Sequence, residues 1–205
     1  MSIYLKRSES SYRFFDKKNT KNSWLTVKIW AFLFEDIMHG ANYRAGTGQP
    51  FTRKKYIKGK PQIKIAKFQG GKRGVYEFCV QLLVNEKVQI RHMAIESCRL
   101  AANKTLEKTT GESGYYSRLR IYPHNLLREN KMIAAAGADR LQEGMRRAWG
   151  KAVSLGARVK QGQCIMEFYV NGPHVDAAKN ALKGACVKLP ATPTIQVKEF
   201  GKMSP

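Results

Sequence analysis

The sequence predicts an α+β protein: a two-layer α/β sandwich with a mixed, mostly antiparallel sheet and two main helices. An extended basic N-terminal arm and a long glycine-punctuated loop are expected in addition. Three observations lead to this prediction. Segments with strand periodicity and segments with helical periodicity follow the order strands, helix, strands, helix, strand. The 205 residues are 43% hydrophobic, enough to fill one core. Their 10% aromatic content is too high for a disordered polycation.

The first expected strands follow a basic stretch that is poor in helix signals. Residues 63–68 alternate apolar and polar with a period of two, which predicts a short strand with lysines on one face. Residues 75–84 form an apolar, strand-like run. Residues 90–107 then form the best candidate helix, ending before Gly111. Its apolar stripe falls at i, i+3, i+7 and i+11, at Ile95, Cys98, Ala102 and Leu106.

The second half of the chain predicts further strands and one more helix. Residues 115–122 alternate again, placing Arg118 and Arg120 on one face, and pairing is expected to resume at Leu126-Leu127. Residues 158–160 and 164–170 are expected to be a pair of strands joined through the turn at 161–163. Asn171-Gly172-Pro173 should start a helix, with a buried stripe and C-cap formed by Val175, Ala178, Leu182 and Gly184. Residues 194–200 form the last expected strand.

The charge of the chain points to a polyanionic partner. There are 37 Lys and Arg against 15 Asp and Glu, a net charge of +22. Nucleic acid is the commonest polyanion that neutralises such an excess. An acidic membrane surface is the second interpretation, and a small-molecule enzyme is the least favoured. Residues 1–37 carry only +3 of the charge, so the predicted contacts with nucleic acid lie downstream.

Residues 1–37 are interpreted as a segment distinct from the rest. The apolar run at 24–34 contains Lys28 and is shorter than the roughly 20 residues that span a bilayer, so no membrane association is expected. Glu35 and Asp36 stand where a secretory cleavage site needs small residues. The codons of residues 35–37 can hold a GAGG ribosome-binding sequence just before Met38. We therefore expect a translated leader, with a lineage-specific extension as the alternative.

No cofactor, metal or catalytic site is expected. Cys79, Cys98, Cys164 and Cys186 form no CxxC pair, which indicates small thiols in a reducing compartment. Gly71-Lys72 fails as a phosphate-binding loop because Ala66 and Arg73 occupy its required Gly and Ser/Thr positions. No pair of acidic residues has a spacing suited to acid–base or two-metal chemistry. A basic RNA-processing enzyme or RNA chaperone remains the alternative function.

Two segments carry the predicted nucleic-acid contacts: a basic arm over residues 38–74 and a loop over 133–150 within a domain of residues 75–205. Nine Lys or Arg and no acid occupy residues 53–73, with aromatic residues among them. Basic side chains neutralise phosphates and aromatic rings stack on bases, so we expect the arm to order only against RNA. The arm residues are Arg44, Arg53, Lys54, Lys55, Lys58, Lys60, Lys64, Lys67, Lys72 and Arg73.

The loop contains Gly137, Gly144 and Gly150, which would each cost an unbroken helix roughly 1 kcal/mol relative to Ala. One interpretation is a broken surface helix. The other is a loop that presents arginines to RNA, with Trp149 packing at its base. We favour the second.

An ordered series of motifs resembles the universal large-subunit ribosomal protein L-sixteen family, in its archaeal and eukaryotic L-ten-e branch. The resemblance covers about residues 41–200 and is most specific in the Ala-Gly-Ala-Asp-Arg-Leu-Gln run at 136–142. Departures occur at Asn42, Arg147 and Ala152, where relatives often have Cys, a small residue and Pro. The other motifs are Asn42-Tyr43-Arg44, Tyr56-Ile57-Lys58-Gly59, Ile90-Arg91-His92, Tyr122-Pro123-His124, Arg128-Glu129-Asn130-Lys131-Met132, Trp149-Gly150-Lys151 and Ala157-Arg158-Val159.

The resemblance implies a structural constituent of the cytoplasmic large ribosomal subunit with no enzymatic activity. It implies binding to large-subunit rRNA below the central protuberance, with 5S rRNA nearby, beside the aminoacyl-tRNA site. Aminoacyl- and peptidyl-site tRNA and neighbouring ribosomal proteins are the other implied partners, and no homo-oligomer is expected. The implied loop residues, facing tRNA and the peptidyl-transferase region, are Arg128, Lys131, Gly137, Asp139, Arg140, Met145, Arg146 and Arg147. Further expected rRNA contacts are Arg91, His92, Arg118, Arg120, Lys151, Arg158 and Lys160.

Overall fold

The computed structural model describes residues 39–48, 56–130, 145–146 and 148–203. Within them the helical elements are η1 (Gly40–Asn42), α2 (His92–Thr110), η3 (Gly172–His174) and α4 (Val175–Cys186). The strands are β1 (Gln69–Gly71), β2 (Tyr76–Val84), β3 (Val88–Arg91), β4 (Tyr115–Leu119), β5 (Asn125–Glu129), β6 (Lys151–Val159), β7 (Cys164–Val170) and β8 (Pro193–Met203). None of the helices described is long and apolar enough to cross a membrane.

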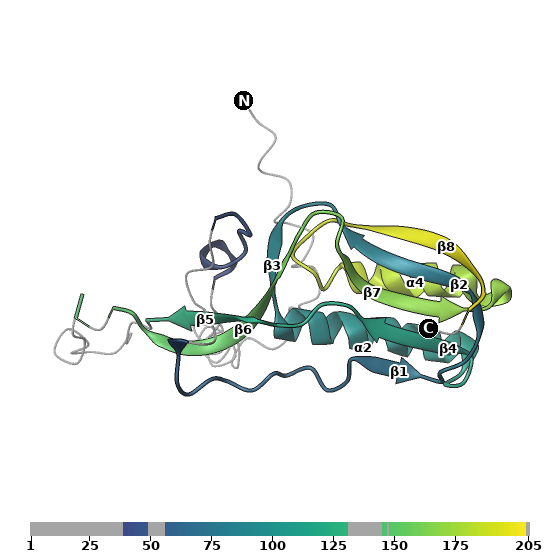
Figure 1. The fold of residues 1–205 in the computed structure, drawn as a ribbon, viewed down its shortest axis with the longest axis horizontal. Coiled ribbons are helices and arrows are strands. Elements are labelled where there is room, and N and C mark those ends of the chain that lie inside the picture. Colours follow the sequence, from purple (N-terminus) through teal and green to yellow (C-terminus); the bar gives the residue numbers. More distant parts are fainter. Residues whose placement is uncertain (1–38, 49–55, 131–144, 147, 204–205) are drawn as a thin grey trace, which may run out of the picture. The chain divides into compact units, whose positions relative to one another are not determined.

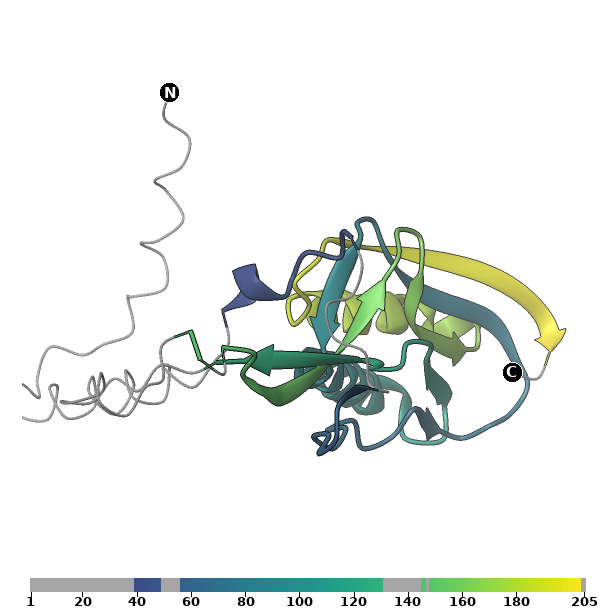
Figure 2. The same cartoon turned by 60° about the vertical axis from the view of Figure 1, so that its left-hand side comes forward.

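The strands form two antiparallel sheets. A five-stranded sheet has the order β1-β4-β7-β2-β8, and a three-stranded sheet has the order β3-β6-β5. Helices α2 and α4 pack against each other and against strands of the larger sheet, while α2 also contacts β3 and β6. Figure 2 shows β8 following β2 along the sheet, and β5 and β6 continuing past the helices as a two-stranded ribbon. The predicted α+β sandwich with two main helices is confirmed.

The core lies between the helices and the larger sheet, as the helical spacing predicts. All four stripe residues of α2 are fully buried, at Ile95, Cys98, Ala102 and Leu106. Ala178 and Leu182 of α4 are buried beside them. Tyr115 meets Phe168 edge to face at a centroid distance of 6.0 Å on the sheet side. Removing an interior leucine from such a core costs about 2–5 kcal/mol.

The two strands expected at 158–160 and 164–170 are present and joined by the turn between them, but they do not pair with each other. Strand β6 pairs with β3 and β5, whereas β7 pairs with β2 and β4 in the other sheet. The turn between them bonds instead to the end of β2, where the Gly162 amide donates to the Val84 carbonyl at 2.7 Å. The Val84 amide in turn donates to the Gln163 carbonyl at 3.1 Å. These bonds direct the chain from one sheet into the other.

The strand expected at 63–68 is wrong, because the described residues contain no strand before β1, although apolar and polar side chains do alternate there between buried and exposed positions. Ile65 is buried and Ile63 packs against the core, while Lys64 is exposed. Ladder pairing with β4 begins only at Gln69. Burial of Ile65 also contradicts the expectation that the arm orders only against RNA, since part of the arm belongs to the protein core.

Element ends differ from expectation in several places, including the start of β6 at Lys151 rather than residue 158 and the end of β8 at Met203 rather than residue 200. Helix α2 starts at His92, because Ile90 and Arg91 belong to β3 and pair with β6. Helix α4 runs through Gly184, so the expected C-cap is wrong and Val187 takes that position. Strand β4 stops at Leu119, before the expected end at Tyr122.

Candidate nucleic-acid interface

The first described part of the basic arm adds to the edge of β3. The Gln89 amide donates to the Arg44 carbonyl at 2.9 Å, and Ala45 forms a bridge with Val88. A Cβ on Gly46 would lie 2.8 Å from the Val88 nitrogen, so this close approach requires glycine. The Arg44 side chain is left exposed, as the predicted RNA contact requires.

Arg158 fastens this segment to β6. Its Nη2 donates to the carbonyls of Gly46 at 2.6 Å and Gly48 at 2.5 Å. Hydrogen bonds from a charged donor are stronger than those between neutral groups. Arg158 is one of the expected rRNA contacts, and the structure gives this half-buried side chain a role within the chain.

The two expected contacts at the start of α2 differ in exposure. Arg91 is half-buried, and its guanidinium carbon lies 5.6 Å from the centroid of the Tyr43 ring. His92 is only 2% exposed. Burial lowers the pKa of His92, and the positive charges of Arg91 and Lys64 lower it further. The structure therefore places a neutral imidazole beneath the surface and Arg91 at its edge.

The rest of the described arm exposes a dense set of cations. The exposed basic side chains within residues 56–76, which contain no acid, are Lys58, Lys60, Lys64, Lys67, Lys72 and Arg73. Tyr56 is 71% exposed, as a base-stacking ring should be. Phe68 stacks instead on Tyr122, with centroids 5.6 Å apart. Arg53, Lys54 and Lys55 lie outside the described residues.

Arg118 and Arg120 lie on the same side of the larger sheet, as their spacing predicts. Arg118 is the register partner of Glu167, and the Arg120 Nε lies 3.5 Å from a carboxylate oxygen of Glu167. Glu167 is buried and also accepts hydrogen bonds from Gln81 Nε2 at 3.0 Å and Tyr169 OH at 3.1 Å. Arg120, which is exposed, therefore has part of its charge compensated within the protein.

The thiols near this face stay protonated because of their surroundings, which makes them poor nucleophiles. Burial, together with the charge of Glu167, raises the pKa of Cys79 to about 11 and that of Cys164 to about 12. All four cysteines are free, and Cys79 and Cys98 are buried. The described residues contain no group of three or more His, Cys, Asp and Glu that could hold a metal ion.

The stem of the predicted loop is closed by a contact between its two sides. The Arg128 guanidinium carbon lies 3.6 Å from the centroid of the Trp149 ring, and Arg128 Nη1 donates to the Trp149 carbonyl at 2.7 Å. Sequence reasoning missed this pair, because the residues are 21 positions apart and only the β5–β6 pairing unites them. At the next position Gly150 has a φ of +72°, and a Cβ there would lie 2.4 Å from the Glu129 backbone.

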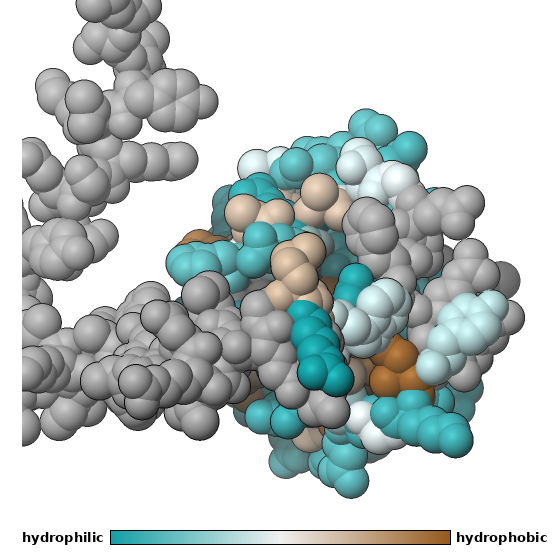
Figure 3. All heavy atoms as spheres, turned by 90° about the vertical axis from the view of Figure 1, so that its left-hand side faces the viewer, coloured by the Kyte–Doolittle hydropathy of each residue, from teal (hydrophilic) through white to brown (hydrophobic). Residues whose placement is uncertain are grey.

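Three further expected contacts beside this stem are exposed. Met145, which is 90% exposed, Arg146 and Lys151 lie on the C-terminal side of the loop. Lys160 is exposed too, but it follows the opposite end of β6. Figure 3 shows the end of the molecule that carries this stem, where hydrophilic side chains surround a few apolar ones. The remaining expected loop residues lie outside the described part, at Lys131, Gly137, Asp139, Arg140 and Arg147.

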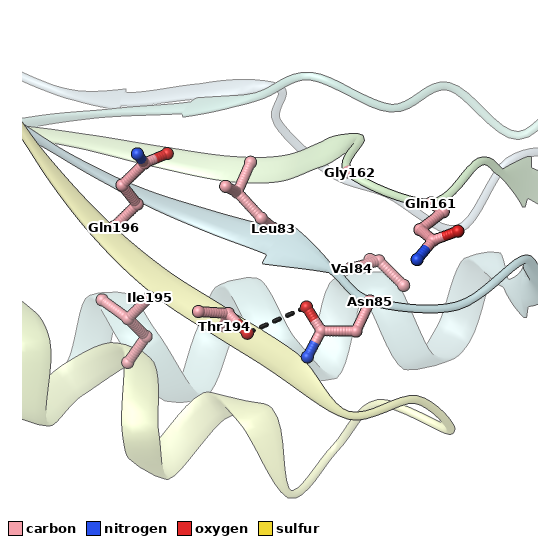
Figure 4. A pocket seen from close by; sticks show the side chains of 8 residues that line it. All are labelled: Leu83, Val84, Asn85, Gln161, Gly162, Thr194, Ile195 and Gln196. Atoms are coloured by element: carbon pink, nitrogen blue, oxygen red, sulfur yellow. Dashed lines mark hydrogen bonds between the residues drawn. The ribbon is translucent and has the colours of Figure 1, made fainter.

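A hollow of about 460 Å³ near the end of β2 has different chemistry (Figure 4). In it Thr194 Oγ1 donates to Asn85 Oδ1 at 2.8 Å. The lining contains amides and apolar groups but no Lys or Arg, so the hollow does not extend the basic surface. Its lining residues are Leu83, Val84, Asn85, Gln161, Gly162, Thr194, Ile195 and Gln196.

Comparison with known proteins gives a consistent family. Residues 46–196 match the family described as ribosomal protein L16p/L10e. The large ribosomal subunit protein uL16 of Hyperthermus butylicus is 50% identical over 155 residues, covering 75% of this chain and 86% of that protein. Its counterpart in Staphylothermus marinus is 48% identical over 157 residues, covering 76% and 90%. That of Archaeoglobus fulgidus is 45% identical over 154 residues, covering 75% and 88%.

Proposed function

The chain belongs to the ribosomal protein L16p/L10e family, and from this premise we propose how it acts in the large ribosomal subunit. It is a constituent of the cytoplasmic ribosome that serves translation through RNA binding and is not an enzyme. Its basic surface binds large-subunit rRNA near the central protuberance, beside the aminoacyl-tRNA site and with 5S rRNA nearby. The loop over residues 133–150 reaches toward the peptidyl-transferase region and the tRNA ends.

The observation that carries the proposal is the row of exposed cations in the arm, from Lys58 to Arg73. Residues 56–76 contain no acidic residue, so the row carries a dense positive charge. Contact with RNA phosphates neutralises this charge and releases counterions. The arm is held against β3 and β4 by backbone bonds, which keeps its cations on a defined path.

The stem of the loop supports the second part of the proposal. Arg128 and Trp149 close the ends of β5 and β6, which run past the helices as a ribbon (Figure 1). A segment carried on such a ribbon can enter an RNA cavity that the body of the protein cannot. Exposed Arg146 and Lys151 add positive charge beside the stem, and this charge would contact RNA phosphates.

The test compares two triple variants of the full chain. Changing Lys58, Lys60 and Lys64 to Gln should weaken binding to large-subunit rRNA and reduce the salt slope by about 0.7–0.9 for each phosphate that the variant no longer neutralises. The matched control changes the exposed helix residues Lys104, Lys108 and Lys183 to Gln, which removes the same charge elsewhere. Equal reductions in slope for both variants would refute the arm as the binding surface.

A further inference from the structure

The Trp149 side chain is exposed in an unusual way. The Arg128 guanidinium covers one face of the indole at 3.6 Å, yet the residue is still 58% exposed. A ring with one face covered keeps this exposure only when its other face is largely open. Single exposed apolar side chains occur elsewhere on this protein, so exposure alone does not mark a site. What distinguishes Trp149 is an indole with one open face, whose other face is held by a cation and whose neighbours are cations.

The indole is held in place from both sides of the strand pair. Arg128 Nη1 bonds to the Trp149 carbonyl at 2.7 Å, so one side chain holds both the ring and its backbone. Gly150 passes so close to the Glu129 backbone that a Cβ would not fit, and Lys151 then pairs with Glu129 in the β5–β6 ladder. The ring is therefore presented in a set orientation, which lowers the entropic cost when a partner stacks on it.

The surroundings of the ring select the chemistry of that partner. Exposed Arg146 and Lys151 flank Trp149 in the sequence, and the cation of Arg128 lies against its covered face. Glu129, the acid of the described part of the stem, is half-buried and has Oε2 shielded from solvent. A flat apolar face among cations suits a planar group attached to a phosphate, which is a nucleotide whose base is not paired.

We propose that Trp149 is a stacking platform for one unpaired RNA base, with Arg128 as the residue that positions it. This inference rests on the proposed function, since it names a base contact at the RNA-binding surface. The base stacks on the open indole face, and its flanking phosphates lie near Arg146 and Lys151. Stacking tolerates any base, so the platform adds affinity and orientation without selecting a sequence.

The experiment uses the full chain with Trp24→Phe and Trp30→Phe, which leaves Trp149 as the only one of three tryptophans. Its fluorescence is followed during titration with a 12-nucleotide oligoadenylate and with an abasic phosphodiester of the same length. Oligoadenylate should quench the emission, whereas the abasic chain should bind without quenching. Trp149→Ala has no tryptophan in this background, so its binding is measured by the anisotropy of a fluorescent label on each oligomer. The substitution should weaken oligoadenylate binding roughly 5- to 150-fold and leave abasic binding unchanged. Trp149→Phe, which keeps a ring for stacking, should retain most of the affinity.

Each outcome separates this inference from the function on which it rests. Salt-dependent binding of both oligomers without quenching at saturation would overturn the stacking platform alone. Equal decreases in affinity for both oligomers in Trp149→Ala would overturn it too, because the indole would then act through the fold. Binding of neither oligomer would overturn the platform together with general RNA binding. Quenching that rises with protein concentration before RNA is added would identify a second copy as the partner and refute the proposal.

Discussion

Arg158→Ala should release the first part of the arm from β6 without unfolding the core. The variant removes two hydrogen bonds from a charged donor to the carbonyls of Gly46 and Gly48. A bond of this kind contributes about 1.5–3 kcal/mol when well shielded. Arg158 is half-buried and both bonds leave from one nitrogen, so we expect about 1–3 kcal/mol for the pair. That free energy corresponds to a local opening that is roughly 5- to 150-fold more frequent.

The assay is hydrogen exchange at the Gln89 amide, which donates to the Arg44 carbonyl and reports attachment of the arm. Its exchange should accelerate by this factor, while amides in the centre of β2 and β7 keep their protection. Lys160→Ala is the matched control, since it removes a charge from an exposed side chain two residues away. Unchanged exchange at Gln89 in Arg158→Ala would refute the clamp, and an equal loss of protection throughout the core would show a global effect instead.

Three other changes have defined outcomes. Gly184→Ala should raise the free energy of unfolding by up to about 1 kcal/mol in urea titration, because the site is inside α4 and a Cβ there meets nothing within 4 Å; a decrease would contradict the helical assignment. The pKa of His92 in the folded protein is lowered from the ordinary 6.5, chiefly by burial, so the unfolded chain binds the proton first as the pH falls. The free energy of unfolding should therefore decline below about pH 6.5 until the folded ring is protonated as well. His92→Gln should show a shallower decline in this window, and an identical pH profile would exclude the histidine as a cause. Arg140→Ala should weaken tRNA positioning in a translation assay while the melting temperature stays within a few degrees, and a large drop in that temperature would show that Arg140 supports the fold.

Local patterns sufficed to predict the helices and most strands. The apolar stripe from Ile95 to Leu106 repeats with the 3.6-residue period of a helix. Residues at this spacing lie on one face of the helix, and that face is the buried one. The apolar run ending at Val84 likewise became β2, an interior strand of the larger sheet that packs against α4. In both cases burial of one face or stripe is enough to determine the element.

Pairing between distant segments could not be predicted in the same way. The turn at Gly162 is typical of a hairpin, yet its hydrogen bonds go to Val84, almost 80 residues earlier, and the two flanking strands enter different sheets. Gly184 is a common type of helix end, but continued packing of Ala185 overrides that preference. Tertiary contacts decided both outcomes.

Composition predicted the kind of partner better than the role of each residue. Charge density singled out the arm, and its described lysines are exposed as expected. Periodicity and charge alone did not distinguish Arg158, which binds backbone carbonyls, from Lys160, which faces solvent. The contact of Arg128 with Trp149 depends on the β5–β6 register, which no short-range motif encodes.

The most direct test is to locate and count this chain in its native source. Large subunits, small subunits and the post-ribosomal supernatant would be separated after a moderate salt wash, and the chain quantified by mass spectrometry against other ribosomal proteins. The proposed function predicts about one copy per large subunit, released only at high salt because phosphate contacts hold it. Recovery mainly in the supernatant, with large subunits that lack the chain, would contradict it.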